Sequence, residues 1–102
     1  MYVSLSRLRV APERAAELIE AFRRRAHLVD DADGFVDLEV WQSDREPEEV
    51  VMVSRWRDRD AFSRYMRSDA HAVSHARIPQ DLDEAIRLDR LEHLHTYEVV
   101  AE

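Results

Sequence analysis

Two histidines carry the first chemical signal in this sequence. His71 and His75 are four residues apart, so on a helix they would share one face and could hold a metal ion together. Asp69 is the only acidic residue close by, and it is poorly placed to complete such a site. We therefore expect no free metal ion. A neutral His75 imidazole could ligate an iron alone, although spacing by itself favours a partly exposed histidine that bonds a neighbouring carbonyl.

Other polar residues have structural explanations that compete with chemical ones. His93 and His95 alternate with Leu94, which places both on one strand face. They could line a pocket or a dimer interface, but a half-exposed strand face is the favoured interpretation. Arg25 and His27 come at the end of a predicted helix, where cations interact well with the helix dipole. Arg25 is also a candidate contact for a ligand carboxylate, because guanidinium binds carboxylates through two hydrogen bonds.

The composition excludes several kinds of chemistry. The chain has 102 residues and contains no Cys, which removes disulfides, thiolate nucleophiles and iron–sulfur clusters. All 15 basic residues are Arg, so no lysine is present to form a Schiff base. The net charge of -7 disfavours nucleic acid and anionic membranes as partners. Without a signal peptide or a membrane-spanning run, we expect one cytoplasmic domain over residues 1–102.

Hydrophobic alternation predicts the strands that would position these residues. The predicted strands cover residues 2–10, 35–42, 50–56 and 91–100. Within 35–42, one face carries Val36, Leu38 and Val40, and the other carries Phe35 and Trp41. The run 50–56 is apolar enough to be central, and the polar stretch 43–49 suits a hairpin loop. Both Trp41 and Trp56 are expected in the core.

Apolar residues three and four positions apart predict the helices. A long helix begins at Pro12 and carries one stripe, formed by Ala15, Leu18, Ile19, Phe22, Ala26 and Val29. Gly34, the only glycine, follows it and is expected at a positive φ. Asp58 caps a short helix that carries on one side Ala61, Phe62, Tyr65 and Met66. Ser68 and Asp69 interrupt this pattern and cap a further short helix at 70–77, and residues 80–90 form a loop.

The predicted order is β-α-β-β-α-β, the ferredoxin-like α+β arrangement. Its helices cover one face of the sheet. The other face must be buried elsewhere, and two sheets packed face to face would bury it. We therefore expect a homodimer, with the dimeric α/β-barrel architecture.

Four landmarks resemble the antibiotic biosynthesis monooxygenase family. They are Pro12 with FRRRAH at 22–27, Asp33-Gly34-Phe35, WRDRDAF at 56–62, and SDAHAVSH at 68–75. The resemblance runs over nearly the whole chain. The closest subgroup by pattern is the heme-degrading monooxygenases, which place a heme-ligating histidine after the helix break, where His75 stands. They also use an asparagine in the first strand and a tryptophan ten residues before the histidine, where this chain has Ser6 and Tyr65.

The resemblance implies a function and a set of site residues. The leading hypothesis is a heme-binding monooxygenase that uses O₂ and an external electron donor to open the porphyrin and release iron. Heme would be both substrate and cofactor, and no flavin is expected. His75 would be the axial ligand and Ser6 a hydrogen-bond donor to distal oxygen. Tyr65 would pack on the porphyrin, Arg25 would contact a heme propionate, and Phe22 and Met66 would wall the pocket.

Two alternatives remain open at this point. The first is a cofactor-independent oxygenase of an aromatic polyketide or quinol, as in other members of the family. The second is a non-catalytic dimer that binds a small hydrophobic ligand. The absence of the family's asparagine and tryptophan at Ser6 and Tyr65 motivates the second alternative. Heme that binds but survives reductant and O₂ would distinguish it from both enzymes.

Overall fold

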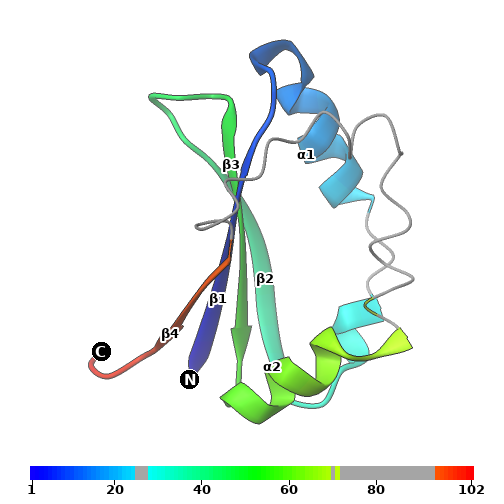
Figure 1. Ribbon diagram of the computed structural model, residues 1–102, viewed down its shortest axis with the longest axis vertical. Helices are drawn as coiled ribbons and strands as arrows, with labels where there is room; N and C mark the ends of the chain where they lie inside the picture. The colour runs from blue at the N-terminus through cyan, green and yellow to red at the C-terminus, as the bar shows by residue number, and fades with distance from the viewer. Residues whose placement is uncertain (25–27, 70, 72–93) are drawn as a thin grey trace.

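The computed structural model describes residues 1–24, 28–69, 71 and 94–102 (Figure 1). The elements in chain order are β1 (Tyr2–Arg9), η1 (Pro12–Arg14), α1 (Ala15–Arg23), η2 (Leu28–Asp31), β2 (Phe35–Gln42), β3 (Glu49–Trp56), α2 (Arg59–Met66) and β4 (Leu94–Glu98). The expectations for Arg25, His27, His75, His93 and the loop 80–90 lie outside the described residues, as does most of the predicted helix at 70–77.

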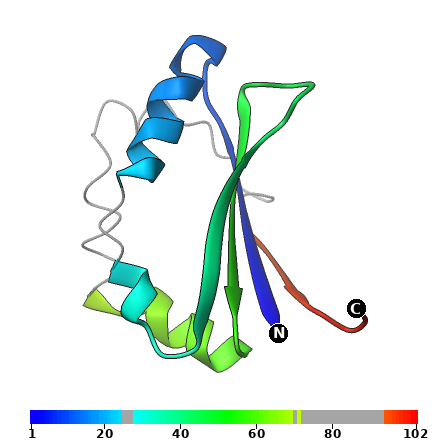
Figure 2. The same cartoon turned by 180° about the vertical axis from the view of Figure 1, so that it is seen from behind.

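The sheet has four strands in the order β2-β3-β1-β4, and every neighbouring pair is antiparallel. Both α1 and α2 lie on one side of it, as the two opposite views show (Figures 1 and 2). The side that faces these helices is called the inner face below, and the other side the outer face. This confirms the ferredoxin-like α+β fold, and the predicted central position of 50–56 is confirmed by β3.

Two hydrophobic clusters hold the helices against the inner face. The α1 cluster consists of Leu8, Val10, Ala15, Leu18 and Val50. The α2 cluster consists of Tyr2, Val29, Trp56, Ala61 and Phe62. Burying each large side chain contributes about 1.5–3 kcal/mol, so each cluster fixes one helix at its own end of the strands.

The predicted long helix is broken. Its first turn is the 3₁₀ segment η1, α1 ends at Arg23, and Val29 belongs to η2. Val29 packs in the α2 cluster, whereas Ala15 and Leu18 pack in the α1 cluster, so the apparent stripe serves two separate cores. Arg23 and Arg24, at the end of α1, are exposed, and both form ion pairs with Glu20, at 3.6 and 2.9 Å.

A β-bulge changes the predicted faces of the second strand. The register shifts between Phe35 and Asp37, because residue 36 has no partner in β3. Phe35 therefore packs against the α2 cluster together with Leu38, and Val36 is exposed. Trp41 points to the outer face and is 46% exposed, so the expectation that it lies in the core was wrong; Trp56, 1% exposed, is in the core as predicted.

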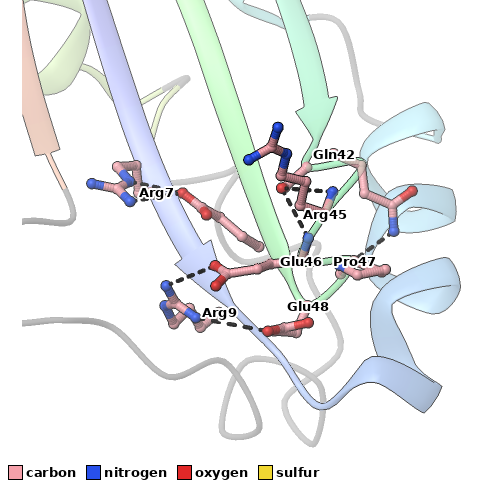
Figure 3. A network of polar contacts seen from close by, with 9 residues as sticks. Arg7, Arg9, Gln42, Arg45, Glu46, Pro47 and Glu48 are labelled. Atoms are coloured by element: carbon pink, nitrogen blue, oxygen red, sulfur yellow. Dashed lines mark hydrogen bonds and ion pairs between the residues drawn. The ribbon is translucent and has the colours of Figure 1, made fainter.

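The β2–β3 hairpin is closed by its own polar groups, as predicted for residues 43–49. The Ser43 hydroxyl accepts from the backbone N–H groups of Arg45 and Glu46, and Gln42 donates to the carbonyl of Pro47. Arg9 of β1 is paired with Glu46 and Glu48 (Figure 3). These two acids therefore form ion pairs at the surface of the hairpin.

Candidate functional site

The centre of the inner face carries uncharged polar residues between the two hydrophobic clusters. Ser4 is paired directly with Ser54 across β1 and β3, and Ser6 is paired with Met52. None of the four belongs to either cluster. Ser4 is only 5% exposed and is the one buried polar residue among the described residues. Burying a hydroxyl is costly without a partner, so these serines are unusual beneath a layer of helices. The four residues Ser4, Ser6, Met52 and Ser54 are called the inner-face floor below.

Phe22 and Tyr65 lie on opposite sides of this floor. Phe22 extends from α1 and packs against the α1 cluster, and Tyr65 extends from α2 and packs against the α2 cluster. Both side chains are half-buried. Met66 follows Tyr65 and is 37% exposed. The structure therefore places Ser6 on the inner-face floor, Phe22 against the α1 cluster and Tyr65 against the α2 cluster, and it leaves Met66 exposed.

The start of α2 is fixed by Asp58, as predicted. Its carboxylate accepts a hydrogen bond from the backbone N–H of Ala61 at 2.8 Å. This bond is the main cause that holds the pKa of Asp58 below its usual value, and the hydrogen bond from Arg57 is the second cause. The negative charge also lies at the positive end of the helix dipole. Asp58 therefore determines where α2 begins and, seven residues later, where Tyr65 projects.

Gly34 lies at the tight corner between η2 and β2, directly against Ala61 of α2. Its φ is +82°, as the sequence predicted, and a Cβ there would collide with the Cβ of Ala61. Its carbonyl accepts from Arg57 N at 2.7 Å. The Arg57 guanidinium also donates to Asp33 and holds the pKa of that carboxyl below its usual range. The corner holds α2 against the end of the sheet that carries Tyr2 and Trp56, so that Ala61 and Phe62 can be buried there.

Tyr65 is held between a core tryptophan and a histidine. Its ring centroid is 5.3 Å from that of Trp56, at an interplanar angle of 32°. On another side it meets the His71 ring edge-on, with centroids 5.4 Å apart. The indole Nε1 of Trp56 donates to the Ser54 hydroxyl at 2.9 Å. Tyr65 thus connects the floor of the inner face to the residues that follow α2.

Ser68 begins the next segment, as the sequence predicted. Its hydroxyl donates to the carbonyl of Tyr65 at 2.6 Å and accepts from the backbone N–H of His71 at 3.2 Å. The second bond is that of an N-terminal cap. His71 is therefore fixed by its backbone and by its ring. His75 and Arg25, predicted to ligate iron and to bind a carboxylate, lie outside the described residues.

Sequence reasoning missed Ser4 and Ser54. Both belong to strands whose other inner-face residues are mostly apolar, and Ser4 and Ser6 alternate in the first strand. This serine alternation was the available signal, but the pairing of Ser4 with Ser54 depends on the register of β1 and β3. Within the described part of the chain, no three His, Asp or Glu residues are grouped to hold a metal ion.

The outer face carries exposed apolar and aromatic side chains. Tyr97 is 52% exposed and is paired with Val3, and Trp41 is 46% exposed on the edge strand β2. His95 is paired with Leu5 and its ring is parallel to that of Tyr97. The Nε2 atom of His95 is buried and, among the described residues, has no hydrogen-bond partner.

None of the described helices is long and apolar enough to cross a membrane.

Comparisons with known proteins give matches to oxygen-using enzymes. The family model described as antibiotic biosynthesis monooxygenase matches residues 1–77. The heme-degrading monooxygenase HmoA of Bacillus subtilis (strain 168) is 31% identical over 77 residues, which cover 74% of this chain and 70% of HmoA. The residues 1–77 that the family model matches contain β1 through α2, and so they include the inner-face floor and Tyr65.

Solved structures show the same fold at lower identity. The heme-degrader MhuD from Mycobacterium tuberculosis, with two hemes bound in its active site, has a TM-score of 0.79 at 22% identity, covering 100% of this chain and 98% of that one. SnoaB from Streptomyces nogalater, a cofactor-independent oxygenase, has a TM-score of 0.74 at 19% identity, covering 99% and 94%. These likenesses establish the arrangement of the elements.

Proposed function

The chain belongs to the antibiotic biosynthesis monooxygenase family, and from this premise we propose that it is a single-domain, cytoplasmic, homodimeric monooxygenase that binds heme as substrate and cofactor. In this proposal His75 would ligate the heme iron. The observation that carries it is the inner-face floor between Phe22 and Tyr65, in a chain 31% identical to a heme-degrading monooxygenase.

The described residues fit a porphyrin by type. Around the floor, Phe22, Tyr65 and Met66 offer aromatic and thioether surface, which suits a large flat hydrocarbon. The directly paired floor residues Ser4, Ser54, Ser6 and Met52 carry no charge. A carboxylate or guanidinium in this floor would lose its hydration when a porphyrin covered it, and that loss costs free energy of binding. The Ser68 cap starts a new segment beside Tyr65, and this segment leads to His75.

Bound heme would supply an iron centre at which O₂, reduced with electrons from an external donor, could oxidise the porphyrin itself to an open tetrapyrrole and release the iron. The protein's contribution is binding and orientation. The Ser6 hydroxyl can both donate and accept a hydrogen bond, and in this proposal it takes the hydrogen-bonding role of the family's asparagine. Tyr65 supplies a narrower aromatic wall than tryptophan. Arg25 would bind a propionate carboxylate through paired hydrogen bonds.

The homodimer is part of the proposal. The outer face exposes Tyr97 and Trp41 and buries one nitrogen of His95 without a partner in the described chain. An unpaired buried polar atom typically costs about 1–3 kcal/mol. A second copy packed on this face would cover the aromatic side chains and could supply a donor to His95. These observations support a sheet-to-sheet dimer.

A heme titration followed by visible absorption tests the binding proposal. We expect a saturable Soret shift that is lost in His75→Ala. His71→Ala tests whether the neighbouring imidazole is the ligand instead: the Soret shift should persist there, because the proposed ligand His75 remains. A shift that is absent, or that survives in His75→Ala, would contradict the proposal. Sedimentation of the same samples measures whether the protein is dimeric.

Cofactor-independent oxygenation of an aromatic polyketide or quinol is the second candidate. The observation that favours it is the hydroxyl-rich floor, with Ser4, Ser6 and Ser54 on the same face. Hydroxyls can bind the oxygens of a phenol or quinone, whereas the hydrocarbon face of a porphyrin offers no partner for them. Oxygen consumption with a quinol in metal-free buffer, together with no Soret shift, would favour this candidate.

A further inference from the structure

We propose that Ser54 is a positioning residue that acts through Trp56 and Tyr65 to fix the start of the segment after α2, at Ser68 and His71. Ser54 belongs to β3 in the sheet, and a continuous series of contacts joins it to that segment. The consequence for heme rests on the proposed function, because this segment carries the proposed ligand His75.

The first contact is between Ser54 and the buried indole of Trp56. Trp56 is 1% exposed, and its single polar hydrogen is donated to the Ser54 hydroxyl at 2.9 Å. An indole N–H can only donate, so any other ring orientation would leave it unpaired inside the core. The hydroxyl therefore selects one orientation of a ring that packing alone would hold less specifically.

The second contact passes this orientation to Tyr65. Phe35 and Phe62 meet Trp56 near edge-on, at 5.4 and 5.7 Å between centroids, and Tyr65 meets it at 5.3 Å with a tilt of 32°. Trp56 is thus surrounded by three aromatic rings. A rotation of the indole would move the surface on which Tyr65 rests, since the core is close-packed.

The third contact joins Tyr65 to the residues after α2 in three ways. Its ring meets the edge of the His71 ring, its carbonyl accepts from the Ser68 hydroxyl, and that hydroxyl accepts from the His71 backbone N–H. A displacement of Tyr65 must therefore displace His71. His75 is four residues further along the chain.

Ser54→Ala removes the hydroxyl and leaves the indole N–H without an acceptor. We expect heme affinity to fall about tenfold, since residues that orient a metal ligand typically change metal affinity by about 10- to 100-fold. Ser54→Thr keeps a hydroxyl at the same position in the strand and should restore affinity. Ser63→Ala, on α2 and outside this series of contacts, is the matched control.

The experiment has a readout without heme. In the heme-free protein, NMR should show shifted resonances for the Trp56 indole N–H and for the His71 amide and imidazole in Ser54→Ala, but wild-type positions in Ser54→Thr and Ser63→Ala. Unchanged His71 resonances in Ser54→Ala would overturn the inference. The inference would also be overturned if Ser54→Ala lowered the melting temperature but bound heme as tightly as the wild-type protein. If wild-type protein binds no heme, the proposed function fails, and the His71 resonances still decide the inference.

Discussion

Gly34→Ala should destabilise the protein strongly, for two separable reasons. The φ of +82° costs an L-residue about 1–2 kcal/mol. The added methyl group would also collide with Ala61, and overpacking of this kind costs about 1–3 kcal/mol. Together they predict a loss of about 2–5 kcal/mol, a large part of the roughly 5–15 kcal/mol that stabilises a small domain. The melting temperature should fall by at least about 8 °C.

The assay is urea unfolding followed by tryptophan fluorescence, applied to a double-mutant cycle. Ala61→Gly removes the Cβ that the new methyl group would meet, and by itself costs about 1 kcal/mol as a helical glycine. In the double variant the collision is relieved, so its destabilisation should be about 1–3 kcal/mol smaller than the sum of the single effects. Strictly additive effects would refute the steric explanation. A Gly34→Ala variant as stable as wild type would refute both the steric explanation and the one based on the positive φ.

Three further perturbations test separate parts of the structure. Leu18→Ala should cost about 2–5 kcal/mol in urea unfolding because Leu18 is fully buried in the α1 cluster, whereas Leu18→Met should cost less than about 1.5 kcal/mol; equal losses would contradict this. The Asp58 pKa is lowered in the folded protein, so its capping contribution is present above the ordinary aspartate value and is lost as pH falls through the lowered one; a carboxyl NMR titration at or above that ordinary value would count against the cap. Tyr97→Glu should weaken dimerisation at least about tenfold in sedimentation, because burying the new carboxylate in the interface should cost more than about 1.4 kcal/mol. Val100→Glu, at a 92% exposed position, is the control. Equal effects of the two substitutions would argue against the outer face as the interface.

Most of the fold could be predicted from the sequence because strand and helix periods are local signals. The strand 35–42 and the Asp58-capped helix match β2 and α2, and β1 and β3 differ from their predictions by one residue at one end. The errors come from non-local choices. Val29 continues the helical stripe in sequence but packs in the other cluster, and the bulge at residue 36 exchanges the faces of Phe35 and Val36.

The candidate site was predictable only in part. Phe22 and Tyr65 could be expected to pack toward the sheet because both belong to apolar stripes of regular helical spacing, whereas a role for Tyr65 in the site came only from the family resemblance. The contact between Ser54 and Trp56 could not, because it requires the indole to be buried with its N–H directed at a residue two positions earlier on the same strand. The exposure of Trp41 likewise depends on β2 being an edge strand, which the hydrophobic pattern does not encode.

The most direct test of the central proposal is the fate of bound heme under turnover conditions. Protein loaded with heme is treated with ascorbate in air, with catalase present to remove free peroxide, and the Soret band and released iron are measured together. The proposal predicts that the Soret band decays while an iron chelator captures about one iron per heme, with His75→Ala inactive. A Soret band that persists unchanged in the wild-type protein would contradict the monooxygenase proposal and favour a heme-binding protein without turnover.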